Sequence, residues 1–163
     1  MSINIIRVKS NDVATLAMVG NEIWHEYYTP LLGVEQVDYM VDKFQSVKGI
    51  SYQLDNGYEY YFAVDDDKIA GYFGVQPQEE SLFLSKLYLK KDFRGKGIAS
   101  VMLAYIKEIA EKYSKNKITL TVNRYNDNTI AVYKHLGFEI IEEQKADIGN
   151  GFYMDDYVMQ LQL

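Results

Sequence analysis

Residues 90–100 read Lys-Lys-Asp-Phe-Arg-Gly-Lys-Gly-Ile-Ala-Ser, a basic, glycine-rich turn between two regular segments. The apolar run at 81–89 predicts a strand, and a helical pattern opens at Ile98. The free N–H groups in the first turn of a helix, together with the helix dipole, favour anions. Because Gly95 and Gly97 carry no side chain, a phosphate can approach the backbone closely. The turn therefore indicates a site for a phosphorylated ligand.

The spacing within the turn narrows the choice of ligand. A P-loop needs four residues between its glycines and then Lys-Ser/Thr, and this turn lacks that pattern. A dinucleotide fingerprint is matched only in part, because Ser100 stands where the third glycine belongs. The pattern Arg-x-x-Gly-x-Ala is complete, as Arg94, Gly97 and Ala99, and Lys96 adds charge. An ordinary basic turn whose glycines reverse the chain is the alternative interpretation.

A second segment, at 122–138, reads Val-Asn-Arg-Tyr-Asn-Asp-Asn-Thr-Ile-Ala-Val-Tyr-Lys-His-Leu-Gly-Phe. It combines a strand end, an asparagine and a helix with the pattern Ala-x-Tyr-x-x-x-Gly-Phe. In order and separation, the two segments resemble the acyl-CoA-binding motifs of the GNAT superfamily of N-acetyltransferases. The resemblance covers residues 81–143. It implies an α/β GNAT fold: one domain over 1–163, with a mixed, mostly antiparallel sheet of six to seven strands, splayed central strands and flanking helices.

The resemblance also implies acetyl-CoA as cosubstrate, with no metal. The pantetheine arm would pair with the strand ending at Leu89, and a backbone N–H near Leu87 would polarise the thioester carbonyl. The pyrophosphate would meet the N–H groups that follow Gly95, and Asn126 would contact the arm. The implied cofactor-binding residues are Leu87, Tyr88, Leu89, Arg94, Gly95, Lys96, Gly97, Ile98, Ala99, Ser100, Asn126 and Tyr133.

Tyr133 is the implied catalytic residue, a general acid for the departing thiolate. A tyrosine pKa of about 10 is close to that of a released thiol, so proton donation need not be strongly uphill. The alternative is a helix aromatic packed on the sheet. His135 lies two positions later and faces elsewhere, as a solvated helix residue. His25 is interpreted as structural or peripheral.

No general base is predicted. The strand at 82–89 contains no carboxylate, although many members of the family place a Glu there. Deprotonation of the amine would then fall to a chain of waters, or to an acid from elsewhere such as Glu22 or Glu26. A small fraction of the amine also arrives neutral.

The composition excludes several classes of protein. The chain has 163 residues, of which 48% are hydrophobic and 25% charged, and this is typical of one soluble globular domain. With no cysteine, a disulfide framework, a thiolate metal site and a Cys nucleophile are excluded. A net charge of −6 argues against nucleic-acid binding. No apolar run matches a membrane span and the N-terminus does not match a signal peptide, so we expect a cytoplasmic protein.

The acceptor side is expected in the N-terminal helices, where Trp24, Glu26 and Tyr28 are the candidate substrate-binding residues. Carboxylates and aromatic faces suit an amine or polyamine cation, although these acids also fit solvated helix faces. The run at 147–159 is similar to bacterial GNATs related to spermidine/spermine acetyltransferases. Three functions stay open: an enzyme for a small amine or polyamine, a protein acetyltransferase acting on an N-terminus or lysine, and a non-catalytic module that binds CoA or a partner. A homodimer is expected by analogy only.

Hydrophobic periodicity and turn residues predict the remaining elements. The predicted helices cover 12–28, ended by Pro30, then 34–44, a short piece at 50–54, 98–113 and 126–136. The predicted strands cover 3–8, 58–64, 69–75, 81–89, 117–122, 138–143 and 152–163. Gly71 and Gly74 suggest a bulge or a close approach within a strand.

Overall fold

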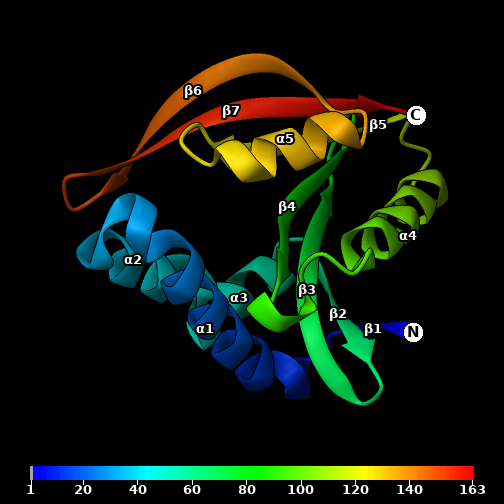
Figure 1. The fold of residues 1–163 in the computed structure, drawn as a ribbon, viewed down its shortest axis with the longest axis horizontal. Coiled ribbons are helices and arrows are strands. Elements are labelled where there is room, and N and C mark those ends of the chain that lie inside the picture. The colour runs from blue at the N-terminus through cyan, green and yellow to red at the C-terminus, as the bar shows by residue number, and fades with distance from the viewer. Residues whose placement is uncertain (1) are drawn as a thin grey trace.

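The computed structural model describes residues 2–163, which form a seven-stranded sheet with helices on both faces (Figure 1). The strand order is β1-β2-β3-β4-β5-β7-β6. The strands are β1 (Ile3–Arg7), β2 (Glu59–Asp65), β3 (Lys68–Pro77), β4 (Leu82–Leu89), β5 (Lys117–Asn123), β6 (Glu139–Gly149) and β7 (Phe152–Gln162). The helices are α1 (Val13–Leu32), α2 (Val34–Met40), α3 (Val47–Asp55), α4 (Ile98–Lys112) and α5 (Asp127–His135). The mixed, mostly antiparallel sheet of six to seven strands with flanking helices, expected from the sequence, is confirmed.

Successive side chains of each strand point to opposite faces of the sheet, so alternate residues pack against different helices. In β2, Tyr61 packs with α4 residues on one face, whereas Tyr60 and Phe62 pack with α1 residues on the other. In β3, Phe73 and Tyr72 divide in the same way. The helices α1 to α3 therefore cover one face of the sheet, and α4 and α5 cover the other.

The sheet opens at its centre. All neighbouring strands are antiparallel except β4 and β5, which are parallel and pair only from Leu82 and Ile118 to Leu84 and Leu120. Beyond Leu84 the two strands separate, which confirms the splayed central strands. The pairing of β4 with β3 continues past this point, through a register shift opposite Gly74.

Gly71 and Gly74 of β3 both sit at close approaches, as the sequence predicted. A Cβ atom on Gly71 would lie 2.0 Å from the carbonyl oxygen of Tyr88. A Cβ on Gly74 would lie 2.7 Å from the ring of Tyr60. Any larger residue would push apart the strands and the ring that shape the centre of the sheet.

The prediction that Pro30 ends the first helix is wrong, because α1 continues through it to Leu32. A proline lacks one N–H donor, but at this position the rest of the hydrogen-bond ladder continues past it. The helix ends instead at Gly33, whose φ of 85° is left-handed and whose N–H bonds to the Thr29 oxygen at 2.9 Å.

Three further elements differ in extent from their predictions. The helix predicted at 34–44 is α2 followed by a π-helical turn, η2 (Val41–Gln45). The short piece predicted at 50–54 is the longer α3, because the Ser46 hydroxyl caps it by accepting from the Gly49 N–H at 3.0 Å. The strand predicted to end at 143 runs to Gly149, since its pairing with β7 continues through two register shifts. The short 3-10 turns η1 (Ser10–Asp12) and η3 (Lys91–Phe93) precede α1 and α4.

Candidate active site

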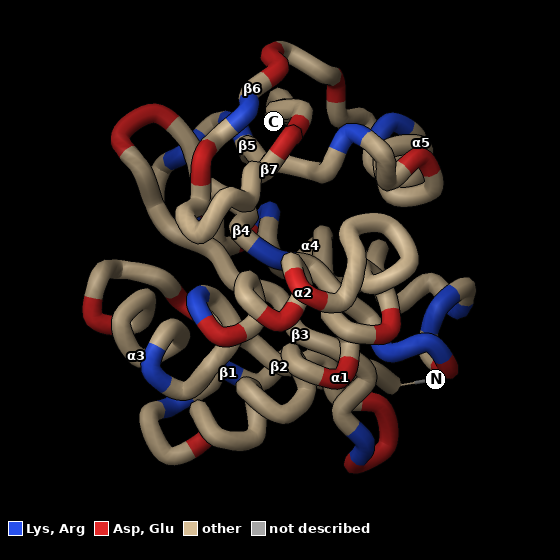
Figure 2. The backbone as a smooth tube through the Cα atoms, turned by 90° about the vertical axis from the view of Figure 1, so that its left-hand side faces the viewer, with Lys and Arg blue, Asp and Glu red and all other residues tan. Residues whose placement is uncertain are grey.

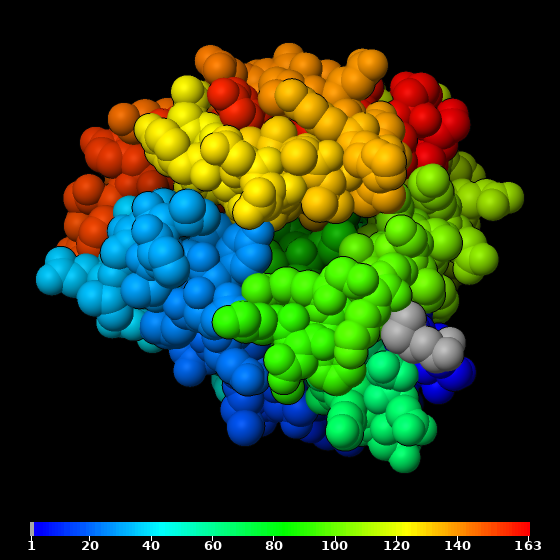
Figure 3. Space-filling model, in the orientation of Figure 1, coloured from blue at the N-terminus to red at the C-terminus, as the bar shows by residue number. Residues whose placement is uncertain are grey.

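A cavity of about 530 Å³ lies where β4 and β5 separate. We call it the α4 cleft. It is lined by the edge of β4, the turn before α4, the first turn of α4 and the inner side of α5. Figure 3 shows it as a hollow between the yellow α5 and the light green segment before α4, with β4 at its floor. The two segments singled out in the sequence therefore face each other across one cavity.

The N-terminus of α4 has no capping side chain. Its N-cap, Gly97, has a left-handed φ of 80°, and Gly95 has a φ of 76°. A Cβ on either glycine would meet no atom within 4 Å, so the space in front of the turn is open. The residues of the first helical turn, Ile98 to Ser100, line the cleft. Their N–H groups are free to bind an anion.

Arg94 does not stand free beside this turn. Its Nε donates to the Leu89 carbonyl at 3.0 Å, and its guanidinium pairs with Glu26 at 2.9 Å and stacks over the Tyr27 ring at 4.9 Å. Arg94, which the sequence analysis assigned to the cofactor, and Glu26, which it assigned to the substrate, therefore form an ion pair with each other. Lys96 lies over the Phe93 ring and is not among the residues that line the cleft.

The edge of β4 offers main-chain groups to the cleft. Leu87, Tyr88 and Leu89 pair with β3 on one side, but the parallel pairing with β5 has ended by that point. Backbone groups on an open strand edge can pair with an extended ligand, as in strand addition. All three residues line the α4 cleft.

Tyr133 of α5 lines the same cleft and is only 7% exposed. Its ring packs against Phe138 with 5.3 Å between centroids, and its hydroxyl makes no hydrogen bond within residues 2–163. Burial, with the nearby Tyr28 and Tyr27, raises the pKa of Tyr133 above its ordinary value. The hydroxyl therefore stays protonated at physiological pH.

Asn126 lies behind the cleft, 4% exposed. Its Oδ1 accepts a hydrogen bond from the Tyr27 hydroxyl at 3.0 Å, whereas its buried Nδ2 has no partner within the described residues. Asn126 is not among the residues that line the cleft, so the structure does not place this buried donor where a ligand in the cleft would meet it.

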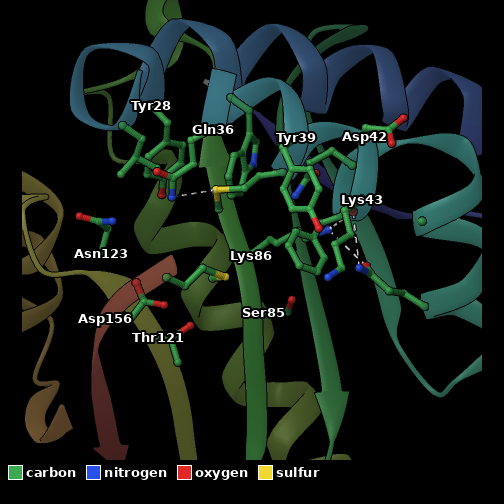
Figure 4. Close-up of a pocket in the computed structure, with 18 of the residues that line it drawn as sticks. Tyr28, Gln36, Tyr39, Asp42, Lys43, Ser85, Lys86, Thr121, Asn123 and Asp156 are labelled. Atoms are coloured by element: carbon green, nitrogen blue, oxygen red, sulfur yellow. Dashed lines mark hydrogen bonds between the residues drawn. The ribbon is translucent and has the colours of Figure 1, made fainter. Parts of the chain in front are cut away.

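A second cavity, of about 760 Å³, lies under α1, α2 and α3 on the opposite face of the sheet. We call it the aromatic pocket, after its rings: Trp24, Tyr28, Tyr39, Phe44, Tyr52, Tyr58, Phe83, Tyr88 and Tyr153. The sequence predicted Trp24 and Tyr28 on the substrate side, and both line the pocket; Glu26 does not. Figure 4 shows Tyr28, Gln36 and Tyr39 on the helical side, with Thr121 and Asp156 on the strand side.

The two cavities adjoin through the gap between β4 and β5. Six residues line both: Tyr28, Ser85, Lys86, Tyr88, Thr121 and Val122. A ligand lying along β4 in the α4 cleft would therefore meet a second ligand in the aromatic pocket at this gap.

The sequence analysis did not identify two buried ionisable residues that line the aromatic pocket, Lys86 and Asp156. Lys86 donates from Nζ to the Phe44 carbonyl at 2.9 Å and to the Tyr60 hydroxyl at 2.6 Å, and burial lowers its pKa to about 7. Asp156 of β7 is 4% exposed, and burial raises its pKa to about 6. Each is a charged residue at a position of an apolar strand that points inward. This pattern in the sequence could have identified both residues, because charged side chains are rarely buried.

His25 lies outside both cavities, as the sequence interpretation had it. Its ring bonds to Asp38 of α2 at 2.5 Å and to the Asn21 carbonyl at 2.9 Å, and both contacts raise its pKa. Among residues 2–163 no group of three or more metal-binding side chains was found. Within that same range, none of the helices is both long and apolar enough to cross a membrane.

Comparison with known proteins agrees with this geometry. The model of the acetyltransferase (GNAT) family matches residues 19–138. An uncharacterized N-acetyltransferase of Mycobacterium tuberculosis is 26% identical over 154 residues, covering 93% of this chain and 98% of that protein. A spermidine N(1)-acetyltransferase of Thermoplasma acidophilum is 24% identical, with 90% and 94% covered. The crystal structure of PaiA N-acetyltransferase from the same organism, in complex with coenzyme A, has the same fold: its TM-score is 0.81 at 22% identity, with both chains fully covered.

Proposed function

Because the chain belongs to the acetyltransferase (GNAT) family and is thus an acetyl-CoA-dependent N-acetyltransferase, we propose that it acetylates the primary amine of a small molecule. One observation carries the proposal: the α4 cleft opens into the aromatic pocket where β4 and β5 separate. Direct transfer requires donor and acceptor to be held in contact, and two adjoining cavities provide that.

Acetyl-CoA fits the α4 cleft by the chemistry of its lining. The uncapped N-terminus of α4, with its open space before Gly97, suits the pyrophosphate. The open edge of β4 at 87–89 suits the amide groups of the pantetheine arm. Coenzyme A bound to the PaiA protein supports this assignment. Since Arg94 is paired with Glu26, we propose that the backbone N–H groups hold most of the phosphate charge.

The bound cosubstrate supplies an activated acetyl thioester, and this chain's residues position and polarise it. A backbone N–H near Leu87 would donate to the carbonyl oxygen as negative charge develops there. The Tyr133 hydroxyl would donate to the departing sulfur. Because its pKa is raised, full proton transfer to the sulfur is less favourable than the sequence argument assumed. Donation of a hydrogen bond is its principal contribution.

The lining of the aromatic pocket guides the choice of acceptor. Aromatic faces suit an organic ammonium with an apolar body. The relative named as a spermidine acetyltransferase supports a polyamine, whereas Lys43, Lys48 and Lys86 along the pocket oppose an extended polycation. We therefore place compact monoamines ahead of polyamines.

A panel of acceptors tests the function. The protein is mixed with acetyl-CoA and each of 2-phenylethylamine, spermidine and a short lysine peptide, and thiol release is followed. We expect the highest kcat/KM with the monoamine. Transfer to the peptide alone would favour a protein acetyltransferase, and CoA binding without transfer to any amine would favour a non-catalytic module. The homodimer and the cytoplasmic location stay predictions of the sequence.

A further inference from the structure

Asp156 is a buried carboxylate that lines the aromatic pocket. It lies in β7 directly opposite Asn123 of β5, so the two side chains share a face of the sheet, and both line the aromatic pocket. Val122, which precedes Asn123 in β5, lines both cavities. Figure 4 shows Asp156 on the strand side of the pocket, across from Tyr28 and Gln36.

The Asp156 carboxylate has no partner in the protein. The residue is 4% exposed, yet within residues 2–163 its oxygens make no hydrogen bond and no ion pair. The neighbouring Asp155 faces the other way and pairs with Arg124 at 2.7 Å. Buried carboxylates in proteins usually have a hydrogen-bond or ion-pair partner, because burying an unpaired charge costs free energy. The arrangement therefore points to a cationic ligand.

The titratable groups near Asp156 come from several elements. Tyr28 of α1 is near enough to be influenced by the charge of Asp156. Besides burial, Asp155 raises the pKa of Asp156 and Arg124, after β5, lowers it. Lys86 of β4, and Asp42, Lys43 and Lys48 of the α2–α3 region, line other parts of the same pocket. Lys86 donates its bonds to Phe44, Gln53 and Tyr60, away from Asp156.

We propose that Asp156 binds the ammonium group of the acceptor and takes its proton, so that it is the general base that the sequence of β4 does not supply. The inference rests on the proposed function. The carboxylate removes one proton from R-NH₃⁺, and the nitrogen lone pair then forms the N–C bond to the acetyl carbon. The C–S bond breaks and the thiolate leaves toward the hydroxyl of Tyr133. The nitrogen loses its second proton as the amide forms, the thiolate takes up one proton to give the thiol, and the proton on Asp156 returns to solvent.

The electrostatics of the site favour this proton transfer. Burial holds the Asp156 pKa near 6, so the group is charged at neutral pH but is a stronger base than an ordinary aspartate. Desolvation in the aromatic pocket lowers the pKa of the bound ammonium, so the difference between its pKa and that of Asp156 becomes smaller. The same carboxylate thus both orients the amine and activates it.

The test is Asp156→Asn, which keeps the shape and removes the charge. Transfer to 2-phenylethylamine is measured at pH 7 and pH 9.5. We expect kcat/KM to fall about 100-fold at pH 7. The loss should shrink to less than about 10-fold at pH 9.5, where much of the amine is already neutral. Calorimetry on the CoA-loaded protein should find 2-phenylethylammonium bound at least about 10-fold more weakly.

Glu59→Gln is the matched control. Glu59 is also a buried carboxylate, 6% exposed, but it bonds to Tyr61 and Tyr113 and lies outside both cavities. This variant should lower stability while keeping the pH profile of the wild type. The inference is overturned if Asp156→Asn stays within threefold of wild type, or if its loss is equal at both pH values.

The affinity for CoA separates the two proposals. Asp156→Asn should bind CoA like the wild type, because Asp156 does not line the α4 cleft. If the wild type bound CoA but acetylated no amine, the proposed function would fail. The binding of 2-phenylethylammonium would still report on Asp156.

Discussion

The substitution Gly97→Glu tests the phosphate site at α4 most sharply. The space before Gly97 is empty, so a glutamate side chain would occupy the position proposed for the pyrophosphate. A carboxylate about 5 Å from one phosphate charge, at an effective dielectric of about 20, costs about 3 kcal/mol. That corresponds to a loss of roughly 100-fold in affinity for CoA, measured by titration calorimetry.

Backbone strain must be separated from this repulsion. Gly97 has a φ of 80°, and any side chain there costs about 1 kcal/mol of stability. Gly57, in the turn before β2, has a φ of 87° and the same open surroundings, so Gly57→Glu carries equal strain far from the cleft. We expect that variant, and Gly97→Ala, to bind CoA within about threefold of wild type. If Gly97→Glu also bound CoA at wild-type affinity, the proposed phosphate site would be wrong.

Three further predictions concern catalysis, packing and pH. Tyr133→Phe should lower kcat by about 10- to 100-fold with little change in CoA affinity, and an unchanged kcat in steady-state assays would remove Tyr133 from the mechanism. Gly74→Val should lower the free energy of unfolding in urea by about 1–3 kcal/mol, because its side chain meets the Tyr60 ring, and an unaltered midpoint would contradict that contact. Asp38 raises the pKa of His25, so the pair stabilises the fold below pH 6.5 and loses this effect as pH rises through the folded-state pKa. Asp38→Asn should therefore lower Tm at about pH 6 and match the wild type at about pH 8.5, whereas a constant difference would refute the linkage.

Local patterns in the sequence were enough to predict much of the fold. The start of a helix at Ile98 was predicted correctly because glycine spacing and a helix start are local features; in the structure Gly97 is the left-handed N-cap of α4. The separation of β4 and β5 followed from the family resemblance and is confirmed by the pairing that ends at Leu84. The prediction that the first helix ends at Pro30 was wrong because a single missing N–H weakens a helix without always ending it.

The charged groups of the site depended on contacts that no local pattern contains. Arg94 and Glu26 are 68 positions apart in sequence, and only the packing of α1 against the turn brings them together. Asp156 stands beside Asp155 in the chain, yet one side chain is buried and the other is paired at the surface, because strand parity decides which faces inward. Such long-range pairing determines which acids are free to act.

The central claim is direct transfer from the α4 cleft to the aromatic pocket. It is tested most directly by mixing the protein with acetyl-CoA first without amine and then with 2-phenylethylamine, while thiol release and the protein mass are followed. We predict no thiol release and an unmodified protein in the first step, then one thiol per amide formed in the second. A burst of thiol with an acetylated protein before any amine is added would contradict the account.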